Sequence, residues 1–235
     1  MASVRVIIKK LIPNSVLNST LLTFPFLYRL PVVRYETNIG LPGLNTLIKE
    51  LEKVVHLEGS IIECGASRCG TTAVMARFLK SQGINKHIYA LDSFEGFPKD
   101  EVEQEKTEGL SSCQPDEFTS TSIEYVTKKM HRLGVGEYVT PVKGFFQDTL
   151  ASLDHDWCFA FVDCDLRDSL LYCAELIWPR LVSGGCIIFD DYNNQVYRGA
   201  RVGVDHFVSK YKAEIGEHHN NRIKNGARGY VVYKL

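Results

Sequence analysis

The chain has 235 residues, 45% of them hydrophobic, and its 27 basic and 28 acidic residues give a formal net charge of -1. This length suits one α/β domain with a small appendage, and it is long enough to bury a core without disulfide bonds or structural metal ions. The near-neutral charge provides no global attraction to nucleic acid, so no nucleic-acid partner is expected. Seven cysteines without CxxC or zinc-finger spacing indicate a reducing compartment, and we expect a cytoplasmic protein.

Residues 1–40 are expected to form an N-terminal helical arm or cap. They carry no acidic residue before Glu36, and their apolar stretches are interrupted by Lys, Asn and Pro. No stretch reaches the roughly 18–20 apolar residues that a membrane span needs. We favour an arm that packs on its own domain, on the partner in a homodimer or over the active site. Weak contact with a membrane surface, or a targeting role, is the alternative.

From residue 41 onward, apolar runs that predict strands alternate with apolar residues at helical spacing. We expect one Rossmann-like, doubly wound α/β domain over residues 41–235, with a mostly parallel seven-stranded sheet whose last strand is antiparallel. The acid-rich segment 99–114 is expected to be a surface loop, and Thr71 or Thr72 is expected to cap a helix that ends near Gln82. The expected strands are 60–63, 87–92, 138–144, 158–165, 184–191, 213–218 and 229–235. The expected helices are 44–55, 71–82, 122–134, 147–153, 169–181 and 199–212.

Polar residues and glycines follow the predicted parallel strands, where open α/β sheets bind their ligands. In "ECGASRCG", Gly65 and Gly70 allow close backbone approach, and the helix that follows has free N–H groups. Asp92 ends the next strand, where an acid typically accepts hydrogen bonds from ribose hydroxyls. Together they favour a ribose-bearing cofactor, while an ordinary tight turn and a turn-capping aspartate are the alternatives. The turn has no Walker lysine, which argues against ATP.

Three aspartates follow two further strands. Asp163 ends "CFAFVD", and the pair Asp190 and Asp191 ends "CIIFDD". Because neighbouring parallel strands lie about 4.8 Å apart, these carboxylates can converge. Like charges at this spacing repel unless something compensates them, and three hard oxygen ligands suit Mg²⁺. We therefore favour a metal site, with helix capping by Asp163 or Asp190 as the alternative.

The motifs "ECGASRCG", "ALDSFEGFP", "VKGFFQDTL", "FVDCDLRDS" and "PRLVSGGCIIFDDY" occur in an order that resembles the macrocin O-methyltransferase family over about residues 40–235. The resemblance implies a class I methyltransferase that uses S-adenosylmethionine and Mg²⁺. It implies Asp163 as a candidate base, and a metal site of Asp163, Asp190 and Asp191. The cofactor-binding residues that it implies are Glu63, Gly65, Ala66, Gly70, Thr71, Asp92, Gly144, Phe146, Gln147 and Asp163.

Three positions depart from the family pattern. Ser67 stands in place of the usual aromatic residue, Cys69 replaces a small residue, and Arg167 occupies the place of a frequent tyrosine. These positions affect the acceptor site and details of cofactor contact, whereas the three aspartates are intact.

The expected activity is methyl transfer to a hydroxyl group of a small-molecule acceptor, a sugar or another natural product that carries a diol. A cofactor-binding module without methyl transfer is the alternative from another functional class. A nicotinamide-dependent oxidoreductase is less favoured, because the glycine turn lacks the third glycine of the dinucleotide fingerprint.

Overall fold

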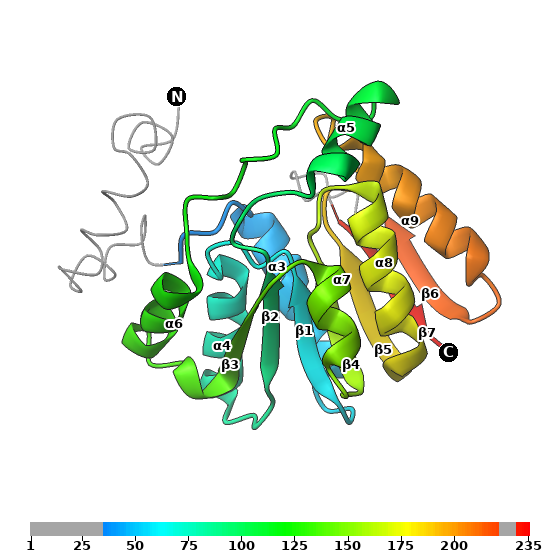
Figure 1. The fold of residues 1–235 in the computed structure, drawn as a ribbon. Helices are drawn as coiled ribbons and strands as arrows, with labels where there is room; N and C mark the ends of the chain where they lie inside the picture. Colours follow the sequence, from blue (N-terminus) through cyan, green and yellow to red (C-terminus); the bar gives the residue numbers. More distant parts are fainter. Residues whose placement is uncertain (1–34, 221–228) are drawn as a thin grey trace.

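The computed structural model describes residues 35–220 and 229–235, which form a seven-stranded sheet with helices on both faces (Figure 1). The strand order is β3-β2-β1-β4-β5-β7-β6. Strands β1 to β5 pair in parallel, and β7 is antiparallel to both of its neighbours. The prediction of a doubly wound, mostly parallel sheet with an antiparallel last strand is confirmed. The strands are β1 (Ser60–Cys64), β2 (Ile88–Asp92), β3 (Val139–Lys143), β4 (Trp157–Val162), β5 (Leu181–Phe189), β6 (Ile215–Asn220) and β7 (Tyr230–Lys234).

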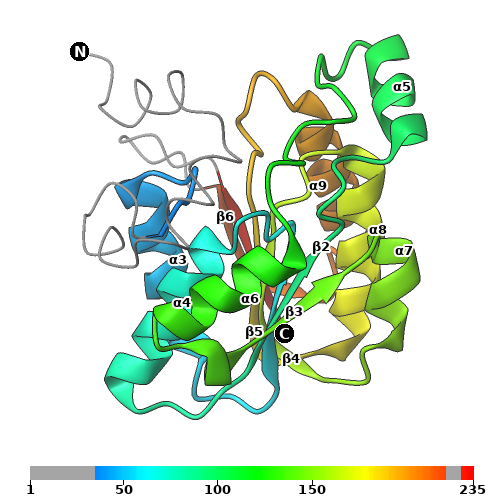
Figure 2. The same ribbon diagram turned by 60° about the vertical axis from the view of Figure 1, so that its left-hand side comes forward.

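Two helical layers cover the sheet. Figures 1 and 2 show α3, α4 and α6 on one face and α7, α8 and α9 on the other, with α5 above the carboxyl ends of the strands. No helix in the described part of the chain is long and apolar enough to cross a membrane. The helices are α3 (Leu41–Val54), α4 (Gly70–Gln82), α5 (Lys99–Thr107), α6 (Ile123–Arg132), α7 (Phe146–Thr149), α8 (Arg167–Ile177) and α9 (Arg198–Lys210).

Each face of the sheet has its own apolar core. Leu51 and Leu79 of the first helical layer pack with Phe159 of β4, whereas Ile177 and Phe207 of the second layer pack with residues that β4 and β5 direct to the other face. Strands buried on both faces explain why the central strands are continuous apolar runs. The sheet is therefore a rigid support, and the loops at its carboxyl edge are free to build a site.

Two local expectations were wrong. Segment 99–114 is not a loop throughout, because Lys99–Thr107 forms helix α5 with Val102 fully buried. Helix α4 begins at Gly70 after Cys69, which has a left-handed backbone and no side-chain cap, so neither Thr71 nor Thr72 is the cap. The hydroxyl of Thr72 donates to Glu63 instead. The predicted arm lies outside the described residues up to residue 34, and residues 35–40 precede α3.

Candidate cofactor and metal site

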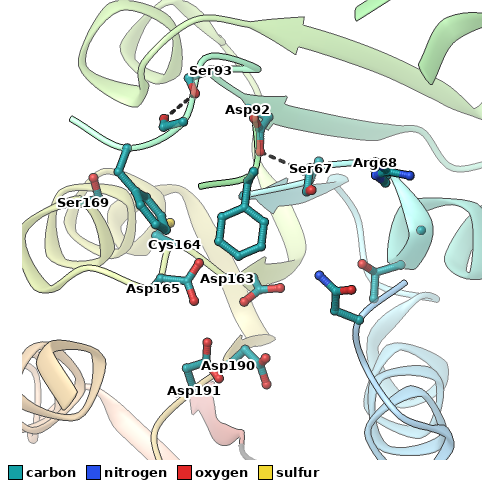
Figure 3. Close-up of a pocket in the computed structure, with 18 of the residues that line it drawn as sticks. Ser67, Arg68, Asp92, Ser93, Asp163, Cys164, Asp165, Ser169, Asp190 and Asp191 are labelled. Carbon is teal, nitrogen blue, oxygen red and sulfur yellow. Dashed lines mark hydrogen bonds between the residues drawn. The ribbon is translucent and has the colours of Figure 1, made fainter. Parts of the chain in front are cut away.

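A single pocket joins the carboxyl ends of β1, β2, β4 and β5 (Figure 3). The turn after β1 and Asp92 line one part of it, and a group of aspartates after β4 and β5 lines another. The predicted residues that line the pocket are Gly65, Ala66, Gly70, Thr71, Asp92, Phe146, Asp163, Asp190 and Asp191. Glu63, Gly144 and Gln147 are not among the lining residues.

The turn after β1 has the close backbone approach that its glycines predict. Gly65 has a φ of +88°, and a Cβ at this position would lie 1.9 Å from the carbonyl oxygen of Asp163. Ser67 and Cys69 also have positive φ angles, which non-glycine residues seldom adopt. The turn is thus held in a strained conformation directly against the end of β4, and such strain is frequent at ligand sites.

Asp92 fixes this turn through its side chain. One carboxylate oxygen accepts the backbone N–H of Ser67 at 2.8 Å (Figure 3), and the other accepts the N–H of Phe94 at 2.7 Å. Burial raises the pKa of Asp92 above its ordinary value, and the two N–H donors oppose that rise. Each oxygen keeps a second lone pair, so Asp92 can still accept a hydroxyl from a ligand.

Glu63 lies beneath the pocket rather than in its wall. Its side chain is fully buried and bonds to Thr72, while Oε1 has no hydrogen-bond partner among the described residues. Burial raises its pKa from the ordinary 4.5 to about 7, and hydrogen bonds from Thr72 and Thr71 oppose this rise. Since Thr71 lines the pocket, Glu63 acts on the site through the first turn of α4.

Three carboxylates meet beyond β4 and β5: those of Asp163, Asp165 and Asp191. One oxygen from each lies within 4.8 Å of the others. Asp190 lines the same pocket but lies outside this set of three, and Figure 3 shows its carboxylate beside that of Asp191. The sequence prediction therefore included Asp163 and Asp191 and missed Asp165. The spacing Asp-Cys-Asp was the signal that could have identified it.

The backbone explains how these carboxylates converge. Asp165 and Asp191 both have left-handed backbones, with φ angles of 61° and 55°. The amide of Asn194 donates to Asp191 at 2.7 Å and orients it. Burial raises the pKa of Asp165 well above its ordinary value, and the hydrogen bond and negative charge of Asp191 raise it further. A divalent cation would relieve this repulsion, and all-oxygen donors suit Mg²⁺.

Residues at the end of the predicted arm and several aromatic rings complete the walls of the pocket. Thr37, Asn38 and Ile39 line the pocket just before α3.

Phe97 packs edge-to-face against Phe118 and Tyr197, with ring centroids 5.5 and 6.2 Å away. The Tyr197 hydroxyl donates to Glu117 at 2.8 Å. No sequence pattern identified these rings, because 197 and 97 are brought together only by the fold.

Helix α5 is docked onto the start of α8, which follows the Asp163–Asp165 loop. Glu105 accepts the backbone N–H of Arg167 at 2.7 Å, and Glu101 accepts that of Ser169 at 3.0 Å. These carboxylates cap a helix N-terminus from outside that helix. The Arg167 guanidinium also pairs with Glu108, just beyond α5. Arg167, one of the three residues that depart from the family pattern, thus helps to hold α5 in place.

The predicted adenine-side residues divide between the pocket and its surroundings. Phe145 and Phe146 line the pocket, whereas the backbone N–H of Gly144 donates to the carbonyl of Asp92 at 3.0 Å. The side-chain amide of Gln147 donates to Glu101 at 3.3 Å, so Gln147 contacts α5. Gly144 therefore helps to position the end of β2, and Gln147 contributes to the docking of α5.

Comparisons with known proteins agree with this geometry. The model of the macrocin-O-methyltransferase (TylF) family matches residues 30–220. A tetracenomycin-C rhamnosyl 4'-O-methyltransferase from Streptomyces olivaceus is 28% identical over 170 residues, which are 70% of this chain and 65% of that protein. Demethyldecarbamoylnovobiocin O-methyltransferase from Streptomyces niveus is 26% identical over 164 residues, which are 66% of this chain and 62% of that protein. The chain thus spans somewhat less than two thirds of these relatives.

Solved structures share the fold. The O-methyltransferase NovP superposes with a TM-score of 0.72 at 22% identity, covering 85% of this chain and 82% of its own. A calicheamicin methyltransferase gives a TM-score of 0.68 at 17% identity, covering 94% and 91%. An O-methyltransferase from Bacillus cereus, solved in complex with SAH, gives 0.58 at 14% identity, covering 95% and 93%. At these identities the likeness concerns the fold.

Proposed function

The chain belongs to the macrocin-O-methyltransferase family, and on that premise we propose that it transfers a methyl group from S-adenosylmethionine to a hydroxyl of a small molecule. A sugar or another diol-bearing natural product is the proposed acceptor. The observation that carries the proposal is the presence of the glycine turn, Asp92 and the carboxylates of Asp163, Asp165 and Asp191 in one pocket. The names of the two Streptomyces relatives describe O-methylation of natural products.

The turn after β1 and the end of β2 would hold the cofactor. Gly65, Ala66, Gly70 and Thr71 would face its amino-acid and ribose portions, because they line the pocket with little side-chain bulk. Asp92 would accept the ribose hydroxyls with the lone pairs that the backbone donors leave free. The rings of Phe145 and Phe146 would flank the adenine.

The aspartates would hold Mg²⁺. Asp163, Asp165 and Asp191 fit it because their oxygens converge and their charges are costly together, and Asp190 stands beside them as a further predicted ligand. Bound there, the cation would lower the pKa of the acceptor hydroxyl.

One of the three carboxylates would take the proton of the acceptor hydroxyl, in which case the other two and Asp190 would hold the cation. The family resemblance implies Asp163 for this role, and Asp165 is a second candidate because its carboxylate lies in the same cluster. A carboxylate that does not bind the cation is a stronger base than one that does, because a bound cation lowers the pKa of its ligand. Substitutions at the two residues therefore distinguish the base from a metal ligand. Replacing the base by Asn leaves metal affinity intact and abolishes turnover, whereas replacing a ligand lowers both.

The remaining contribution of the chain is alignment. The turn after β1 and the aspartate after β4 follow adjacent strands, and Gly65 in that turn contacts the Asp163 backbone directly. This contact would keep the methyl donor and the acceptor hydroxyl at a fixed relative position, which is a large source of rate acceleration for a two-reactant transfer.

Calorimetry of the purified full chain tests the proposal. We expect S-adenosylmethionine and S-adenosylhomocysteine to bind, and Mg²⁺ to bind in a separate event that EDTA removes and that Asp191→Asn abolishes. Mass spectrometry then monitors methyl transfer to a panel of sugar and catechol acceptors. Asp154→Asn is the matched control, because this side chain is almost completely exposed and pairs with Arg180 away from the pocket. Absence of binding by either cofactor form would refute the proposed activity.

A further inference from the structure

Lys129 of α6 is a fully buried lysine that joins two separate segments of the pocket. Its ammonium donates to the backbone carbonyls of Tyr35 at 2.8 Å and Arg68 at 2.6 Å, and it pairs with Glu36 at 3.2 Å. Burial lowers the pKa of Lys129 below its ordinary value, and Glu36 opposes that shift. A charge buried this deeply is tolerated only when it is paired and hydrogen-bonded, so its contacts are specific.

Glu36 uses both carboxylate oxygens in the same network. Oε1 pairs with Arg68 at 3.0 Å, and Oε2 accepts the Tyr125 hydroxyl at 2.7 Å as well as the Lys129 ammonium. The Glu36 backbone is left-handed, with a φ of 51°, and its side chain is only 5% exposed. A strained backbone persists when the surrounding contacts hold it, and here three side chains do so.

The network presses residues 35–37 against the first turn of α4. A Cβ at Gly70 would lie 2.6 Å from the carbonyl oxygen of Tyr35 and 2.7 Å from Cα of Thr37. Thr37 fixes the next step of the chain, because its hydroxyl accepts the N–H of Ile39 at 3.1 Å. Residues 36–39 therefore reach the pocket wall beside the glycine turn.

Arg68 extends the network to a third segment. Besides Glu36, its guanidinium donates to the hydroxyl of Ser120 at 2.9 Å and to the Ser120 carbonyl at 3.3 Å. Ser120 lies in the connection between α5 and α6, two residues after Phe118 in the pocket wall. Figure 3 shows Arg68 beside Ser67, whose N–H is held by Asp92.

We propose that Glu36, Arg68 and Lys129 form a positioning junction that assembles the cofactor end of the pocket from residues 35–39, the β1 turn and the α5–α6 connection. The inference rests on the proposed function, because the bound molecule is the methyl donor. Lys129 lies behind the wall and acts through the segments that it holds, so it is a positioning residue. Preformed walls reduce the ordering that binding would otherwise require, and loss of the junction weakens cofactor affinity.

Lys129→Met tests the junction, since Met keeps much of the lysine volume and leaves Glu36 paired with Arg68. We expect affinity for S-adenosylhomocysteine, measured by calorimetry, to fall about tenfold to a hundredfold, because the walls lose their fixed position. Mg²⁺ affinity remains unchanged, and hydrogen exchange of residues 35–39 becomes faster. Lys80→Met is the matched control: this lysine also donates to a backbone carbonyl, that of Gly134, but away from the pocket.

Glu36→Gln provides a second variant that preserves shape if Lys129→Met does not fold. It removes the charge and keeps a single oxygen acceptor, either for Arg68 or for Tyr125 and Lys129, and we expect a loss of affinity in the same direction. Wild-type affinity in folded variants would overturn the inference, even with faster exchange, because the junction would then be structural only. A wild-type chain that binds no S-adenosylhomocysteine would overturn the proposed function, and this inference with it.

Discussion

The carbonyl oxygen of Asp163 faces Gly65 so closely that a Cβ on Gly65 would lie 1.9 Å from it. The end of β4, which carries the first aspartate, therefore sets the shape of the turn after β1. The cofactor and metal parts of the pocket meet at this backbone contact, so a change at the contact itself displaces both.

Gly65→Ala is expected to disturb both parts of the pocket. The new methyl group would clash with the Asp163 carbonyl, and the φ of +88° would be strained for alanine. We expect a loss of about 2–4 kcal/mol in the free energy of unfolding, measured by urea denaturation, together with weaker binding of both S-adenosylhomocysteine and Mg²⁺.

Gly83→Ala is the matched control for Gly65→Ala. Gly83 also has a positive φ, +65°, but no atom lies within 4 Å of the position that a Cβ would take there. It should cost only about 1 kcal/mol, because it adds backbone strain without a clash. Equal losses at the two positions would show that the contact with Asp163 is unimportant.

Glu63→Gln is expected to stabilise the ligand-free protein at high pH. The pKa of Glu63 rises from 4.5 to about 7 on folding, so the native state disfavours the charged form. The stability of the ligand-free protein therefore falls as the pH increases from 4.5 through 7, by about 3 kcal/mol in total for this group.

Thermal denaturation between pH 5 and pH 8 checks this prediction. The variant should lack most of the decline between these values, since Gln cannot ionise and still accepts the Thr72 hydroxyl. A decline equal to that of the wild type would mean that Glu63 does not titrate in this range. Glu58→Gln is a suitable control, because Glu58 precedes β1 on the opposite edge of the sheet.

Asp165→Asn should raise the melting temperature of the metal-free protein and reduce the further increase that Mg²⁺ produces. Burial, the hydrogen bond and charge of Asp191, and the charge of Asp163 all raise the pKa of Asp165, so a neutral side chain removes the cost of burying this group. Differential scanning calorimetry with EDTA and with Mg²⁺ measures both effects. Asp168→Asn, on a partly exposed side chain of α8, controls for a change of charge nearby. An unchanged response to Mg²⁺ would remove Asp165 from the ligand set.

Glu105→Ala is expected to loosen α5. Glu105 accepts the N–H of Arg167 at the start of α8, and loss of such a cap costs about 1–2 kcal/mol. Amide exchange in α5 should become faster, and acceptor affinity should fall more than cofactor affinity, since Phe97 leads into this helix. Glu103→Ala is the control, because Glu103 is exposed on the same helix. Equal exchange in the two variants would contradict the docking role of Glu105.

The amino-acid sequence was sufficient to predict the fold and most of the strand-end residues. Buried parallel strands must be apolar on both faces, and their polar ends must meet at one edge, so Asp92, Asp163 and Asp191 could be placed from their positions along the chain. The close backbone approach at the turn after β1 could also be predicted from its glycines, because Gly65 occupies a backbone conformation that other residues avoid.

The groups that complete the pocket could be identified only in the folded chain. The residues of α5 have the composition of a solvated stretch, since nothing local reveals that Glu101 and Glu105 accept the first N–H groups of α8. Lys129 reads as one more charge on an amphipathic helix, yet its partners Glu36 and Arg68 are 93 and 61 residues away. Local pattern records which side of an element is apolar, but the pairing of buried charges depends on long-range contacts that only folding creates.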